Sequence, residues 1–168
     1  MKWLHWTMAG SAITCIVTVQ LQQATKDPEE KGKWMFIHKS SGLLTGMLAV
    51  PRIIARVGTR MPADLPGPTL QKIVANLNHL ALYGVIVGMP VSGIIMGYFG
   101  GKGLPFFFTT IPGAPEDQRD GALAKRAYLL HKQAGKVFEY GILPAHLGGV
   151  AVHLLKRDKI LRRMNPFV

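Results

Sequence analysis

The sequence has little cysteine and little acidic charge. Cys15 is its only cysteine, which excludes an internal disulfide and a thiolate metal cluster. No small-x-small cleavage site follows the apolar stretch from Met8 to Val19, so we expect a retained helix there and not a removed signal peptide. Nine acidic residues stand against 20 Lys and Arg, and only 17% of the residues are charged, so charge is concentrated in few places.

The distribution of charge along the sequence decides what the excess of basic residues indicates about partners. A net charge of +11 would suit nucleic-acid binding, which needs Lys and Arg along a phosphate-facing surface. Here the basic residues are concentrated between long, nearly uncharged segments, a pattern that such binding does not require. We therefore expect no nucleic-acid partner and a lipid bilayer as the surroundings.

Four apolar segments approach the roughly 20 residues that cross a hydrocarbon core. They are residues 3–20, 35–57, 73–97 and 128–155. The sequence predicts an all-α integral membrane protein, a single domain over residues 1–168 in which four helices form an up-down-up-down bundle. The turn residues Gly103, Pro105, Pro112 and Gly113 indicate that the third loop is structured but not helical.

An even number of spans places both termini and the second loop on one side of the membrane. That side is rich in basic residues, from Lys2 through Arg52 and Arg56 to Arg162 and Arg163, whereas the opposite side is nearly balanced. By the positive-inside rule we expect the termini on the inner, cytoplasmic or matrix-like side. The expected location is a bacterial inner membrane or an organellar inner membrane.

All six histidines lie within or at the ends of the apolar segments. They are His5, His38, His79, His131, His146 and His153. A single such histidine is most often a hydrogen-bonding residue between helices, but six together indicate a cofactor. Antiparallel threading brings His5 and His146 to one depth on the inner side, and His38 and His131 to one depth on the outer side. Paired imidazoles suit a non-covalent haem that transfers electrons, because both axial positions of the iron are filled.

The fourth segment would supply one ligand to each pair. His131 and His146 are 15 residues apart, roughly 22 Å along a helix axis, which suits two stacked haems. In a regular helix, this spacing leaves their side chains about 60° apart in direction. A proline kink at Pro144, or a π-helical turn near it, would absorb the extra residue.

Each outer histidine is followed by a lysine and, four residues on, by a glycine, Gly42 after His38 and Gly135 after His131. A glycine at this spacing lies on the face of the histidine and leaves room for a flat macrocycle, with close helix packing as the alternative.

Three lysines, Lys39, Lys132 and Lys136, are expected near the outer pair. They would bind haem propionates or form a positive funnel for a small anion, and the alternative is that they snorkel to the membrane surface. His79 has no partner in this scheme. Quinone binding, a hydrogen bond to a propionate and a structural role all stay open for it.

With these residues in place, the chain resembles the bacterial-type cytochrome b561 family over nearly its full length. The motifs that carry the resemblance are Leu4-His5-Trp6, Ile37-His38-Lys39-Ser40-x-Gly42 followed by Arg52 and Arg56, His79-Leu-Ala-Leu-Tyr83, Met89-Pro90-x-Ser92-Gly93, and Arg157-Asp158-x-x-Leu161-Arg162-Arg163-Met164-x-Pro166. The resemblance implies two b haems, held by His5, His38, His131 and His146. The family usually has the two histidines of its fourth helix one residue closer together, which would place the inner ligand at Ala145. It often has a further histidine where this chain has Asn76.

The resemblance also implies a function. It is that of a dihaem b membrane protein that passes single electrons from an outer-side donor, superoxide in the best-characterised members, through both haems toward quinone. Whether the chain is itself a superoxide:quinone oxidoreductase stays open, and one haem is the alternative to two. A second hypothesis is an accessory subunit of a larger respiratory or photosynthetic membrane complex, without independent turnover. A third is a transporter or structural bundle in which the histidines relay protons or join helices.

Overall fold

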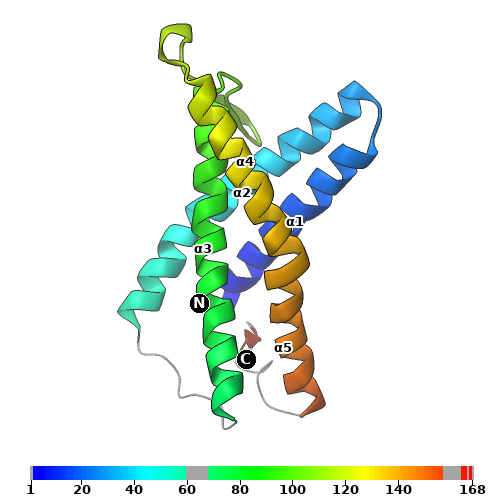
Figure 1. Cartoon of the computed structure of the whole chain (residues 1–168), viewed down its shortest axis with the longest axis vertical. Helices are drawn as coiled ribbons and strands as arrows, with labels where there is room; N and C mark the ends of the chain where they lie inside the picture. Colours follow the sequence, from blue (N-terminus) through cyan, green and yellow to red (C-terminus); the bar gives the residue numbers. More distant parts are fainter. Residues whose placement is uncertain (1, 60–67, 157–163, 166, 168) are drawn as a thin grey trace.

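The structure is a computed structural model that describes residues 2–59, 68–156, 164, 165 and 167. It is built mainly from four long helical rods (Figure 1). The first three are α1 (Lys2–Ala24), α2 (Pro28–Gly58) and α3 (Thr69–Phe99), and the fourth joins α4 (Gly121–Val137), the π-helical turn η2 (Phe138–Ile142) and α5 (Leu143–Leu155). The prediction of four helices is confirmed. We refer to α4, η2 and α5 together as the fourth helix.

Aspartate side chains cap the N-termini of two of these helices, which therefore begin several residues before the apolar segments. At the start of α2, the Asp27 carboxylate accepts hydrogen bonds from the backbone N–H groups of Glu29 and Glu30, at 3.4 and 3.2 Å. At the start of α4, the Asp120 carboxylate accepts one from the N–H of Leu123, at 2.8 Å. Such caps satisfy N–H groups that have no partner in the first turn. The two helices therefore begin at residues 28 and 121, earlier than the residues 35 and 128 expected from hydropathy.

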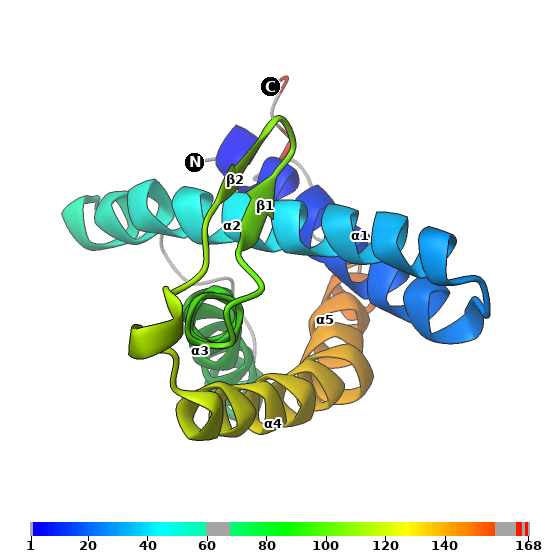
Figure 2. The same ribbon diagram turned by 90° about the horizontal axis from the view of Figure 1, so that it is seen from above.

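The loop between α3 and α4 departs from the prediction of an all-α fold. It contains an antiparallel hairpin of β1 (Leu104–Phe106) and β2 (Thr109–Ile111), followed by the short 3₁₀ helix η1 (Glu116–Gln118). Gly101 and Gly103, with φ of 69° and 68°, turn the chain into the hairpin in a conformation that favours glycine. The hairpin runs across α2 and its tip projects beyond the bundle (Figure 2).

The helices pack as two pairs. α1 lies along α2, and α3 lies along α4, while the two pairs meet mainly through α2 and α3. Small polar side chains fill the first pair, where the Ser11 hydroxyl donates to the backbone oxygen of Ser41 at 2.8 Å and lies 2.8 Å from the Thr45 hydroxyl. Small residues of this kind let membrane helices approach closely.

The seam between the pairs is equally close. A Cβ atom added to Gly46 on α2 would lie 2.8 Å from the Cβ atom of Pro90 on α3. Glycine is therefore required at this crossing, because any larger side chain would push α2 and α3 apart.

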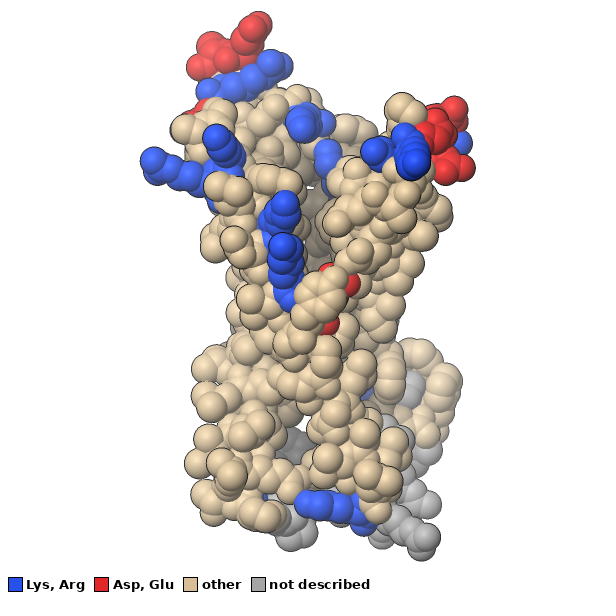
Figure 3. All heavy atoms as spheres, turned by 45° about the vertical axis from the view of Figure 1, so that its right-hand side comes forward, with Lys and Arg blue, Asp and Glu red and all other residues tan. Residues whose placement is uncertain are grey.

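Two of the described helices, α1 and α3, are long and apolar enough to cross a membrane. The charged side chains visible in Figure 3 lie toward the upper part and the lower end of the molecule, with an uncharged region between them. The second loop and most of the C-terminal basic motif, which entered the expectation about orientation, lie outside the described residues.

Candidate functional site

The outer histidines face each other across the two helix pairs. His38 on α2 and His131 on α4 have ring centres 6.2 Å apart, and their ring planes are inclined by 79°. They come from different pairs and from positions 93 residues apart in the sequence. The fold therefore brings together the two side chains that antiparallel threading had placed at one depth.

Hydrogen bonds orient both outer rings. The Nδ1 atom of His38 lies 2.9 Å from the backbone oxygen of Cys15. The Nδ1 atom of His131 lies 3.1 Å from the backbone oxygen of Met89 and 2.9 Å from the Ser92 hydroxyl. Since a carbonyl oxygen only accepts, a hydrogen bond to it puts the proton on Nδ1 and leaves Nε2 free to bind a metal.

Ser92 fits this assignment. Its hydroxyl lies 2.7 Å from the backbone oxygen of Gly88, to which it donates its single proton. Its oxygen can then accept from the Nδ1–H of His131. A ligating histidine whose second nitrogen is held in this way keeps its ring orientation and becomes a more basic ligand. Sequence reasoning missed this role, although Ser92 lay in the Met89-Pro90-x-Ser92-Gly93 motif.

The inner site gathers three histidines. His5 on α1 and His146 on α5 have ring centres 6.3 Å apart, and the ring of His79 on α3 lies 5.8 Å from that of His146. His79 thus joins a cluster from which the sequence had left it out. The remaining histidine, His153, lies elsewhere, with its Nε2 atom 3.5 Å from the side chain of Gln71.

The π-helical turn explains how His146 reaches His5. A π turn holds one more residue than an α-helical turn, and η2 lies between His131 and His146. It therefore takes up the extra residue in the spacing of 15, and His146 rather than Ala145 is brought to the ring of His5. The Asn78 side chain donates to the backbone oxygen of Ile142 at 3.1 Å, and the Gln20 side chain donates to Glu139 at 2.7 Å. Both contacts hold the turn from neighbouring helices.

The ring separations fit a haem held between two imidazoles. A metal–imidazole bond is about 2.0 Å long. Two such bonds, together with the distance of each nitrogen from its ring centre, place the ring centres roughly 6 Å apart. The separations of 6.2 and 6.3 Å agree with this value. In the described part of the chain no group of three or more His, Cys, Asp or Glu is arranged to hold a metal ion, and paired imidazoles are the arrangement that haem iron uses.

The two glycines of the outer motifs face neighbouring helices. A Cβ atom on Gly42 would lie 3.9 Å from the Cys15 sulfur, and one on Gly135 would lie 3.5 Å from the terminal methyl of Met89. These are ordinary packing distances, as the alternative of close helix packing requires. Room for a macrocycle at these glycines stays a prediction.

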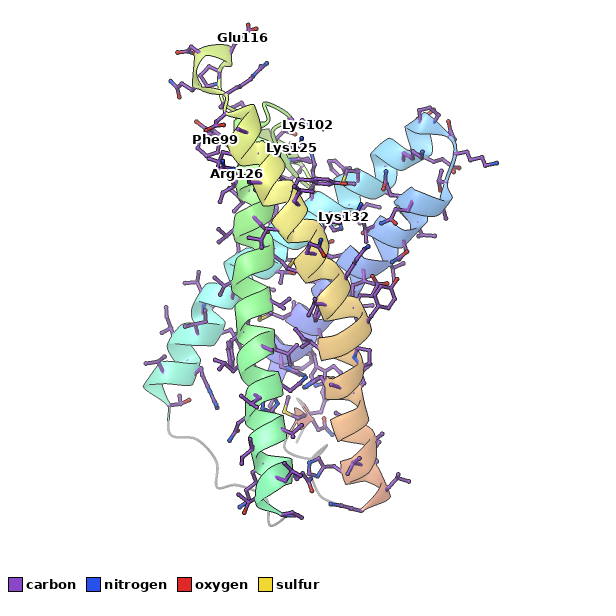
Figure 4. All side chains as sticks on the ribbon, in the orientation of Figure 1. Phe99, Lys102, Glu116, Lys125, Arg126 and Lys132 are labelled. Atoms are coloured by element: carbon purple, nitrogen blue, oxygen red, sulfur yellow. The ribbon has the colours of Figure 1, made fainter. Side chains whose placement is uncertain are left out.

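Basic residues occur near both histidine groups. Lys39, half-buried on α2, interacts electrostatically with Lys102 of the third loop. Lys132 and Lys136 are exposed on α4, and Figure 4 places Lys132 along α4 below Lys125 and Arg126. Figure 3 shows a run of Lys and Arg side chains along this surface at the hairpin end, with acidic side chains at the upper corners of the same end.

Two arginines accompany the inner cluster. Arg52 and Arg56 of α2 both interact electrostatically with His79, and Arg52 also interacts with His5. Both arginines were part of the sequence motif in α2, but their position beside His79 was not foreseen. They supply positive charge at the inner site.

The profile of the family described as prokaryotic cytochrome b561 matches residues 1–166. The chain belongs to this family. It is 26% identical over 165 residues to a protein of Yersinia pestis named probable superoxide oxidase CybB, covering 97% of this chain and 92% of that protein. It is 27% and 30% identical to the Escherichia coli K12 proteins named cytochrome b561 homolog 1 and homolog 2, each over 132 residues. These alignments cover 77% and 76% of this chain, and 73% and 68% of the two relatives. As a member of the cytochrome b561 family, the chain is an integral membrane, haem-binding electron-transfer protein.

Proposed function

We propose that this cytochrome b561 carries two b haems and passes single electrons from a small anionic donor, superoxide, toward quinone. The observation that carries the proposal is the pair of facing histidines at each end of the bundle, His38 with His131 and His5 with His146, at ring separations of 6.2 and 6.3 Å. Each separation is that of two imidazoles on one metal.

The protein would contribute position and ring orientation. When bound by a pair of these histidines, the haem would supply one-electron transfer and would have no open position for oxygen or substrate. Cys15, Met89 and Ser92 fix the outer rings through Nδ1, so that Nε2 of each ring is free for ligation. The fourth helix would supply one ligand to each site, and η2 sets their relative direction.

The donor side would be the end that carries the hairpin. Lys39, Lys132 and Lys136 place positive charge there, and Lys102 adds to it. A positive surface raises the local concentration of a small anion and its rate of encounter. Superoxide gives up one electron to become dioxygen. Two successive encounters would therefore deliver two electrons, which reduce a quinone to a quinol together with two protons taken from water.

The quinone side would be the inner cluster. His79 lies beside the proposed ligand His146, and Arg52 interacts electrostatically with the proposed ligand His5. Both Arg52 and Arg56 interact with His79, and none of the three is needed for ligation. The three side chains are hydrogen-bond donors at the inner end of the bundle, where they could hold a quinone oxygen or a haem propionate. With both termini on the cytoplasmic side, as the excess of basic residues there favours, this cluster would face the cytoplasmic half of the membrane.

Haem content in single-histidine variants tests the proposal. The purified protein should show b-type bands in a reduced-minus-oxidised spectrum and two haems per chain. We expect His131→Ala to lose one haem and His146→Ala to lose the other, with distinguishable bands. His153→Ala is the matched control, because His153 lies beside Gln71 and outside both sites, and it should keep both haems.

Other outcomes would redirect the proposal. An absence of b-type bands would remove the haem assignment altogether. Haem content as expected, but constant co-purification with other subunits and no quinone reduction by superoxide, would instead support an accessory subunit of a larger complex.

A further inference from the structure

The tip of the β1–β2 hairpin is an exposed aromatic cluster that the proposed electron transfer does not use. Phe106, Phe107 and Phe108 are consecutive, and the ring of Phe106 lies 5.2 Å from that of Phe107 and 5.8 Å from that of Phe108. Phe107 is 47% exposed and Phe108 is 87% exposed. Three adjacent phenylalanines at the end of a projecting hairpin require a partner that covers apolar surface.

The tip is fastened to α2 through its backbone. Ser40 is fully buried beneath the hairpin, where its hydroxyl accepts from the N–H of Phe107 at 3.0 Å and donates to the backbone oxygen of Pro105 at 3.3 Å. The N–H of Phe108 donates to the backbone oxygen of Phe106 within the turn. These bonds satisfy polar backbone groups at the tip, as a segment that enters a bilayer must do.

The conformation of the tip is held at some cost. Phe107 has a φ of 41°, which is uncommon for a residue with a bulky side chain. Such conformations persist where the surroundings fix them, often at functional positions. Here Ser40 holds the backbone of Pro105 and Phe107 against α2, while the side chains of Phe107 and Phe108 are exposed.

The position of Ser40 gives the depth of the tip. On α2, Lys33 precedes Ser40 by seven residues, which is about 10 Å along the helix axis, and Lys39 precedes it directly. His38, one of the outer histidines, is only two residues away, so the tip is attached near the depth of the outer site. We therefore expect the tip at the boundary between headgroups and acyl chains, where the Lys39 side chain can reach the headgroups and apolar rings can reach the acyl chains.

The tip also continues an apolar surface of α2. Phe36, Met47 and Ile54 are four residues before Ser40 and seven and 14 residues after it, so they share its helix face. They are 39%, 61% and 66% exposed. In an integral membrane protein, an exposed apolar helix face of this kind is expected to meet acyl chains.

We propose that the Phe106–Phe108 tip inserts into the lipid leaflet on the hairpin side and anchors the third loop in the membrane interface beside α2. The base of the hairpin is fixed to α3, since Leu104 is buried against Gly97. The hairpin would therefore tie α3 to the membrane surface over α2, near the entrance for the electron donor.

Alkylation of introduced cysteines in lipid nanodiscs tests this. In a Cys15→Ser background, Phe108→Cys is compared with Glu116→Cys, in the exposed η1, and with Met47→Cys, on the exposed face of α2. A water-soluble maleimide should react with position 108 at least about tenfold more slowly than with position 116, because a thiol in lipid rarely ionises. All three positions should react alike after unfolding in SDS.

A second measurement, crosslinking to lipid, identifies what covers the tip. A diazirine on the acyl chain of phosphatidylcholine should crosslink to positions 108 and 47 and not to position 116. Equal alkylation rates at 108 and 116 would overturn the proposal, since the tip would then lie in water. Slow alkylation at 108 without lipid crosslinking would overturn it too, because protein would then cover the tip.

The two hydrogen bonds between Ser40 and the hairpin offer an independent check. Ser40→Ala removes both hydrogen bonds to the hairpin, and we expect it to raise the alkylation rate at Phe108→Cys severalfold. Ser11→Ala, in the interface of α1 with α2, is the control and should leave that rate unchanged. Helical circular dichroism shows in every variant that the bundle is folded, so the result does not depend on haem content.

Discussion

The ring of His146 lies 6.3 Å from that of His5, although His146 is one residue too far from His131 for a regular helix to direct both correctly. The π-helical turn η2 between them holds the surplus residue. A residue inserted into an α-helix is accommodated in this way without changing the direction of the helix on either side. The register of the inner ligand therefore depends on this one turn.

Deletion of Gly141 tests that dependence. Gly141 lies within η2 and its Cβ position has no neighbour within 4 Å. Removing it should return the fourth helix to α-helical geometry, and we expect two haems per chain to be retained. Insertion of an alanine after Gly141 should instead turn His146 by about 100° and remove the inner haem alone. Loss of the inner haem in the deletion variant would contradict the role assigned to the turn.

Replacing Ser92 should change the outer haem potential. Ser92→Ala removes one of the two oxygens that accept from the Nδ1–H of His131 and leaves the backbone oxygen of Met89 as the other. The histidine becomes a less basic ligand, which stabilises the oxidised haem less, so the midpoint potential should rise. A hydrogen bond of about 1 kcal/mol corresponds to about 40 mV for one electron. Redox titration measures the shift, and Ser11→Ala, whose hydroxyl bonds Ser41 and Thr45, should leave the potential unmoved.

The crossing of α2 with α3 should not tolerate a larger side chain. Gly46→Ala places a Cβ atom 2.8 Å from the Cβ atom of Pro90, and the resulting overpacking should destabilise the fold by about 1–3 kcal/mol. Thermal unfolding followed by circular dichroism measures the loss. Gly10→Ala, whose added Cβ meets nothing within 4 Å, is the control. An unchanged melting temperature for Gly46→Ala would show that the helices can separate freely.

The lysines on the hairpin side should act through long-range attraction. We expect Lys39→Gln and Lys132→Gln each to slow superoxide-driven reduction about threefold to tenfold at low ionic strength, and the difference should shrink as salt is added. Stopped-flow absorbance of the reduced bands measures the rate. Lys33→Gln is the matched control, since Lys33 is paired with Glu29 at 2.7 Å in the first turns of α2. An equal effect in that control would mean that overall charge, and not this surface, sets the rate.

Much of the fold followed from the sequence, because apolar length and histidine depth are properties of single segments. Four helices were predicted, and the structure brings His38 to His131 and His5 to His146 as threading expected. The ligand roles of these residues stay predictions, as do those of Gly42 and Gly135.

What sequence reasoning missed depends on contacts between distant segments. A π-helical turn was considered near Pro144, but its position depends on Asn78 of α3, whose side chain holds the Ile142 carbonyl. The hydrogen bond that fixes the hairpin to Ser40 joins residues more than 60 positions apart. The place of His79 beside His146 depends on how α3 and α5 pack. Neither periodicity nor composition within one segment carries such information.

The two helix pairs meet mainly at α2 and α3. This arrangement affects how the protein and its prosthetic group come together. In the described part of the chain, α1 contacts the fourth helix much less than α2 contacts α3, and the side chain of Gln20 donates to Glu139 across that side. Each pair is a helical hairpin, and the two hairpins are joined mainly along the seam through Gly46. Each proposed ligand pair takes one histidine from each hairpin, so we expect a bound prosthetic group to join the two halves.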